Sequence, residues 1–111
     1  MDLFFATRKI EKRLVTPEAR QREYGRDAAR ALRTRLANLA DAADLGVMRS
    51  LPGNCHELIG DRKGQLALDI GKGARLVFEP TTDPLPLTPG GALDWQCVTA
   101  IRILEVIDYH G

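Results

Sequence analysis

The chain has 111 residues, of which 44% are hydrophobic and 28% are charged, and its formal net charge is +1. This composition is typical of one globular domain and excludes a disordered polyelectrolyte. Charged residues interrupt every apolar run before it reaches the length of a membrane span, and the N-terminus lacks the apolar core of a signal peptide. We therefore expect a single cytoplasmic domain over residues 1–111, without a membrane partner.

Positive charge is concentrated in the first half of the chain. Residues 1–55 carry eleven basic and seven acidic residues, whereas residues 56–111 carry five basic and eight acidic residues. Twelve of the basic residues are arginine, the side chain best suited to bidentate phosphate contacts and to stacking on bases. A solvated helix face with paired charges would give the same asymmetry. The charge pattern therefore permits a nucleic-acid partner without requiring one.

The first half of the chain predicts a strand followed by two helices. Residues 3–6 are apolar and partly aromatic, which is typical of a strand or of the entry to a helix. Thr7 is a suitable N-cap for a short helix over residues 8–15. Thr16 followed by Pro17 marks the start of a second helix.

The second helix is predicted to continue through residues 18–44, because apolar residues recur there every three or four positions. Gly25 falls inside this range, and we expect it to allow close packing without ending the helix. The stripe should pack on the sheet through Leu32, Leu36 and Leu39.

The second half of the chain predicts three or four strands. Apolar and polar side chains alternate at residues 55–59, 65–70 and 75–79, and turn sequences separate these segments. A hairpin turn between the first two carries Arg62 and Lys63 at its tip.

The last predicted strand covers residues 97–108, and apolar residues on both of its faces predict a central position in the sheet. Before it, residues 80–95 hold four of the six prolines and form an irregular excursion. Cys55 and Cys97 both lie in predicted strands, so we expect free buried thiols and no disulfide. The spacing of cysteines and histidines does not match a zinc site, and no cofactor is expected. The order of elements predicts an α+β domain with a mainly antiparallel sheet and helices packed on one face.

Three segments combine features of a known family: LPGNCHELIGDRKGQLALDI at residues 51–70, RLVFEP at 75–80 and EVIDYH at 105–110. Together they resemble the RelE/ParE toxin superfamily, most of all its HigB-like branch of type II toxin–antitoxin systems. The resemblance covers nearly the whole chain, although no single segment is a diagnostic motif. It implies a RelE-like fold and a small toxin that cuts mRNA on the translating ribosome. A helix-turn-helix antitoxin from an adjacent gene would hold it inactive.

The resemblance also assigns functional residues by position. The candidate catalytic residues are His56, Arg75, Asp108, Tyr109 and His110. The candidate RNA-binding residues are Arg62 and Lys63 in the hairpin, together with Arg22 and Arg26 on the predicted long helix. The proline-rich segment at residues 80–95 and the low net charge depart from the family's pattern.

The chemistry of these candidates is consistent with RNA cleavage that needs no metal. Attack of a ribose 2′-OH on the adjacent phosphate needs a base, an acid for the leaving oxygen and a cation for the phosphorane. His56 and His110 are the two histidines of the chain and can supply the base and the acid. Arg75 can supply charge, Tyr109 can stack on a base, and Asp108 can orient His110.

Other interpretations of the same residues stay open. Arg75 can simply pair with Asp69 or Glu79, and the charged hairpin can protect a sheet edge. A ParE-like gyrase inhibitor needs no acid or base of its own, so the two histidines favour the ribonuclease. A non-catalytic relative that acts as a binding module is a third hypothesis. A DNA-binding antitoxin would need a helix-turn-helix, which the strand-rich second half does not offer.

Overall fold

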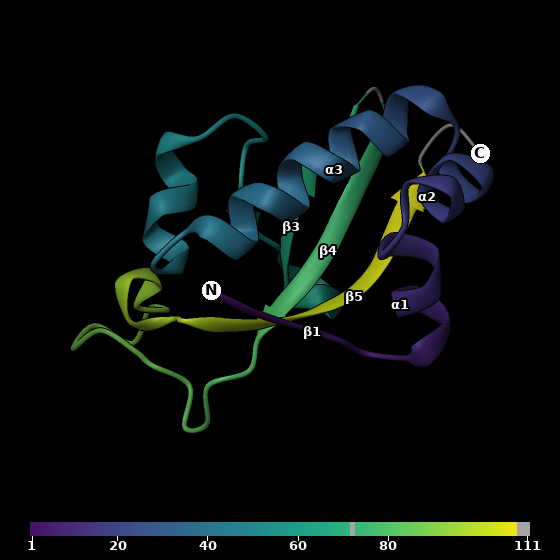
Figure 1. Ribbon diagram of the computed structural model, residues 1–111. Coiled ribbons are helices and arrows are strands. Elements are labelled where there is room, and N and C mark those ends of the chain that lie inside the picture. Colours follow the sequence, from purple (N-terminus) through teal and green to yellow (C-terminus); the bar gives the residue numbers. More distant parts are fainter. Residues whose placement is uncertain (72, 109–111) are drawn as a thin grey trace.

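The computed structural model describes residues 1–71 and 73–108 and contains one sheet with helices on one side (Figure 1). The sheet has five strands in the order β1-β5-β4-β3-β2. The longest helix, α3, lies across the sheet, and α1 and α2 lie near the end of β5 (Figure 1). The α+β class predicted from the sequence is confirmed.

The strands pair in a mixed pattern. β1 (Asp2–Phe5) is parallel to β5 (Ala100–Asp108), and the other pairings are antiparallel. β4 (Ala74–Pro80) follows β5 in the sheet, then β3 (Leu66–Asp69), and β2 (His56–Glu57) forms the outer edge. The last strand of the chain therefore lies inside the sheet, as its two apolar faces predict.

The first two helices, α1 and α2, begin where the sequence predicts. In α1 (Arg8–Leu14) the Thr7 hydroxyl accepts a hydrogen bond from the Ile10 N–H at 3.1 Å. In α2 (Pro17–Tyr24) the Thr16 hydroxyl accepts one from the Ala19 N–H at 3.1 Å. Each hydroxyl satisfies a backbone donor that has no partner within its helix.

The predicted single helix over residues 18–44 is wrong, because Gly25 ends α2 and α3 (Arg26–Asp41) starts immediately after it. Gly25 has φ 85° and ψ 168°, a conformation open essentially to glycine alone. The chain therefore changes direction at this residue, and the two helices pack against each other as a pair.

The core lies between α3 and the facing side of the sheet. Leu32 and Leu39 of α3 are fully buried, whereas Leu36 is only partly buried at the margin of the same cluster. Their partners are side chains that point to this face from the inner strands: Leu66, Leu68, Leu76, Phe78, Ile101 and Ile103. Burial of each leucine contributes roughly 1.5–3 kcal/mol to stability.

Two predictions for the second half need correction. The segment at residues 55–59 forms a strand only at His56–Glu57, after which the chain turns through a 3-10 helix at Gly60–Arg62. Cys97 lies in another 3-10 turn, Trp95–Cys97, and is exposed, so it is neither in a strand nor buried. Both cysteines are free thiols, as predicted.

A bulge in the β4–β5 pair changes which side chains of β5 share a face. Phe78 pairs with Ile103 and Val77 with Glu105, so Leu104 is an extra residue. Val106 and Asp108 therefore point to the same side as Ile101 and Ile103. Strict alternation along the strand would place them on the opposite side.

No helix in the described part of the chain is both long enough and apolar enough to cross a membrane.

Candidate functional site

The sheet face that α3 does not cover is called the open face here. Side chains of β4 alternate between the two faces, with Leu76 and Phe78 toward α3 and Arg75, Val77 and Glu79 on the open face. The strand register places the following neighbours on the open face too: His56, Ala67, Asp69, Arg102, Glu105 and, on β1, Phe4.

Three ion pairs cross this face. The Arg75 Nε lies 3.3 Å from the Asp69 Oδ1, as one of the structural interpretations of Arg75 anticipates. The Arg62 Nη2 lies 3.2 Å from the Glu105 Oε1, and the Arg102 Nη1 lies 3.1 Å from the Glu79 Oε1. Each side chain is roughly a third to a half exposed. Such pairs contribute about 0–1 kcal/mol, so an incoming phosphate can replace a carboxylate partner at low cost.

His56 and Arg75 share the open face with one strand between them. His56 pairs with Ala67, which pairs with Val77, and Arg75 is two residues from Val77 along β4. Strand spacing places the two Cα atoms roughly 12 Å apart. The His56 Nδ1 is 2.7 Å from the Asn54 backbone oxygen, which orients the ring and leaves Nε2 for other contacts. Ala67 and Val77 lie between the two candidates in the strand register, and both are buried.

Asp108 does not join this pair. Because of the bulge it points to the helix side of the sheet, opposite Ala74, and lines a cavity of about 590 Å³ with Tyr24 and Arg26. Two sequence candidates, Arg26 and Asp108, are thus brought to one cavity beside the turn at Gly25. Burial raises the pKa of the Tyr24 phenol, so this ring stays neutral at physiological pH. Tyr109 and His110, the remaining catalytic candidates, lie outside the described residues.

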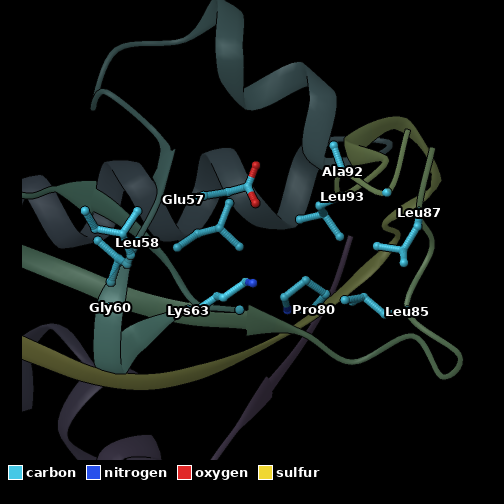
Figure 2. Close-up of a pocket in the computed structure, with 13 residues that line it drawn as sticks. Glu57, Leu58, Gly60, Lys63, Pro80, Leu85, Leu87, Ala92 and Leu93 are labelled. Atoms are coloured by element: carbon cyan, nitrogen blue, oxygen red, sulfur yellow. The ribbon is translucent and has the colours of Figure 1, made fainter. Parts of the chain in front are cut away.

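The hairpin candidates also separate. Arg62 donates to the Gln65 side chain at 2.9 Å and reaches Glu105 on the open face. Lys63 instead lines a cavity beside β2 (Figure 2). From the sequence, Arg62 and Lys63 are predicted to lie together at the tip of one hairpin. The 3-10 turn at Gly60–Arg62 instead directs them to different surfaces.

A groove between α2 and α3 gathers four arginines: Arg20, Arg26, Arg30 and Arg33. It encloses about 240 Å³, and no acidic side chain lines it. Within residues 1–71 and 73–108, none of these guanidinium groups forms an ion pair with a carboxylate. Arg22 is exposed on α2 but does not line the groove. We call this feature the arginine groove.

Four residues that can contribute to binding are not among the candidates chosen from the sequence: Arg20, Arg30, Arg33 and Phe4. Arg30 and Arg33 follow Arg26 at helical spacing, so the α3 stripe is visible in the sequence, whereas Arg20 joins it only because the chain turns at Gly25. Phe4 is 53% exposed and is paired in register with Arg102. An exposed aromatic ring on a sheet is a platform on which an RNA base can stack.

No model of a known protein family matches this chain, and a search of curated proteins also finds no match. The family resemblance therefore depends on the three sequence segments quoted above.

Proposed function

We propose that this chain is the toxin of a type II toxin–antitoxin system, with a RelE-like fold, and that it cleaves mRNA on the translating ribosome. The fold part of the proposal is supported by the order of elements, a strand, helices and then the strands β2 to β5, together with the quoted segments. The observation that carries the catalytic part is that the strand register puts His56 and Arg75 on one sheet face, opposite α3.

In this proposal the cleaved phosphate binds at Arg75, within reach of His56 on the same face. Arg75 exchanges its contact with Asp69 for the phosphate and stabilises the negative charge of the phosphorane. The bond from the 2′-oxygen to phosphorus forms while the bond to the 5′-oxygen breaks. His56 and His110 take the proton of the 2′-OH and return one to the leaving 5′-oxygen. Neither histidine is assigned to one of the two steps.

RNA contact extends beyond the cleaved bond. Arg62 lies on the same open face as Arg75, and Phe4 offers a stacking surface at the edge strand β1. The arginine groove supplies positive charge on the helix side, where ribosomal phosphates can bind. A cognate antitoxin from an adjacent gene is the expected protein partner.

Growth arrest on induction, together with primer extension on a translated message, tests the catalytic assignment. Replacing either proton-transfer residue in His56→Ala or His110→Ala should lower cleavage by about 10²–10⁴-fold. Arg75→Ala should do comparable harm, and Arg75→Lys should recover only part of the activity because an ammonium lacks the bidentate fork. Arg102→Ala is the matched control, since it removes an arginine from the same face and leaves the proposed reacting groups in place.

The control should retain at least a tenth of the parent rate, which corresponds to a loss of about 1.4 kcal/mol. If folded His56→Ala, His110→Ala and Arg75→Ala proteins cut mRNA as well as the parent, the assigned site is wrong.

A second candidate function is binding without RNA cleavage, either to DNA gyrase or to another macromolecule. It is favoured by the position of Asp108, which points away from the face that holds His56 and Arg75. An intact message combined with inhibited gyrase supercoiling would select the ParE-like alternative. An intact message with active gyrase would select a non-catalytic binding module.

A further inference from the structure

A second cavity lies on the opposite side of β2 from the proposed catalytic face (Figure 2). It encloses about 440 Å³ between the edge strand, the turn that follows it and the proline-rich segment. Its walls are mostly apolar, and include Leu58, Leu66, Pro80, Leu85, Leu87 and Leu93. This volume and lining are typical of a binding pocket.

Two charged side chains line this cavity, and they differ in their partners. The Glu57 Oε2 accepts a hydrogen bond from the Trp95 Nε1 at 3.0 Å. The indole is buried, and the Arg49 guanidinium stacks 3.9 Å from its ring centre. Glu57 is therefore held as part of the wall. The Lys63 ammonium extends into the cavity toward Pro80 (Figure 2) and has no ion pair or hydrogen bond with any described residue.

Exposed apolar side chains extend the surface beyond the cavity itself. Ile59 is 88% exposed, Leu87 is 54% exposed and Leu85 is 44% exposed, and all three line the cavity rim. Exposed apolar side chains around a cavity are typical of a docking site, because covering them removes apolar area from water. The occupant is thus larger than a small molecule enclosed by the walls.

The main chain beside the cavity can pair with an added strand. β2 is at the edge of the sheet. The Leu58 N–H donates to the Gln65 backbone oxygen at 2.8 Å, so alternation directs the N–H and C=O of Glu57 away from β3. An extended peptide placed along this edge can bond to Glu57 and direct alternate side chains into the cavity.

We propose that this cavity docks an extended segment of a partner protein that carries apolar side chains and one carboxylate. The apolar side chains fill the space between Leu66 and Leu93, and the carboxylate pairs with Lys63. The main chain of the segment bonds to the β2 edge at Glu57. This assignment does not depend on RNA cleavage, since no residue of the catalytic proposal lines the cavity.

A random heptapeptide library displayed on phage tests this assignment on the full-length chain, with selections run in parallel on the parent and on Lys63→Glu. Peptides selected on the parent should combine apolar residues with Asp or Glu. Synthetic versions should bind Lys63→Glu about tenfold or more weakly, because the carboxylate would face a like charge. Selection on Lys63→Glu should yield basic residues in place of acidic ones.

Two further variants control for folding and for nonspecific charge. Leu85→Asp changes a rim side chain and should also weaken binding, while the fluorescence of Trp95, the only tryptophan, reports whether the wall is intact. Lys12→Glu reverses an exposed charge on α1, outside the cavity, and should leave affinity unchanged.

Three outcomes overturn the proposal: no enriched peptide, peptides that bind the parent and Leu85→Asp equally, or loss of affinity in Lys12→Glu equal to that in Lys63→Glu. A dimer of this chain that Leu85→Asp abolishes also overturns it, because a second copy would then be the occupant.

Discussion

The two cysteines occupy opposite environments, which predicts different reactivity. Burial raises the pKa of the half-buried Cys55 thiol to about 12. Cys97 is exposed, and its hydrogen bond to the Asp94 carboxylate at 3.4 Å raises the pKa of that thiol above its ordinary value. Since the thiolate is the reactive form, iodoacetamide at pH 8 should modify Cys97 first and Cys55 only after unfolding.

Mass spectrometry of the intact protein and its peptides gives the order of modification. The rate at Cys97 should rise with pH, and Asp94→Asn should accelerate it at pH 8 because the thiol pKa falls toward its ordinary value. Cys97→Ser is the control and should remove the fast phase. Rapid labelling of Cys55 in the native protein would contradict the burial described here.

For individual residues of the candidate site, the alternation of side chains in the sequence predicts the correct sheet face on β4 but not on β5. Alternation along β4 correctly separates Arg75 from Leu76 and Phe78, because that strand is regular through these residues. Alternation along β5 fails at Asp108, because the extra residue Leu104 reverses the facing of everything after it. A bulge arises from pairing between strands, so the pattern of one strand does not reveal it.

At the scale of elements, Gly25 decides how the helical half is divided. Its φ of 85° with ψ 168° admits only glycine without strain, and a Cβ built there meets no atom within 4 Å. Gly25→Ala should therefore lower the free energy of unfolding by about 1–3 kcal/mol through backbone conformation alone. Chemical denaturation measures this change.

Gly90→Ala is the matched control. Gly90 does not have a positive φ, and the nearest atom to a new Cβ is the Thr88 Oγ1 at 3.9 Å, so the change should stay within about 0.5 kcal/mol. Equal effects of the two substitutions would show that α2 and α3 do not turn at Gly25 as described.

The helices show why the fold class is predictable and the division into helices is not. The caps at Thr7 and Thr16 are local interactions, and they are confirmed. The apolar stripe continues across Gly25 because α2 and α3 each turn apolar residues toward neighbouring parts of the core. The spacing of apolar residues therefore predicts which residues are buried before and after Gly25. It does not predict that α2 ends there, because that depends on the backbone conformation of Gly25.

At the scale of the whole molecule, the arginine excess of the first half is organised as a groove. The open face pairs each of its three arginines with a carboxylate, whereas no ion pair neutralises the arginine groove within the described residues. Guanidinium groups without a carboxylate partner repel one another, and a polyanion that binds them removes that repulsion. The net charge of +1 hides this division because acidic residues are concentrated elsewhere.

The salt dependence of RNA binding tests whether the arginine groove binds phosphates. Affinity for ribosomes or for single-stranded RNA should fall steeply as salt concentration rises. Each lost phosphate contact should flatten the slope of log K against log salt by about 0.7 on a single strand. Replacing Arg30 and Arg33 with glutamine should therefore flatten it by about 1.4 if each contacts one phosphate. Lys12→Gln removes an exposed charge from α1 and should leave the slope nearly unchanged. Equal flattening by the control and by the double substitution would show that diffuse charge, and not the groove between α2 and α3, binds the phosphates.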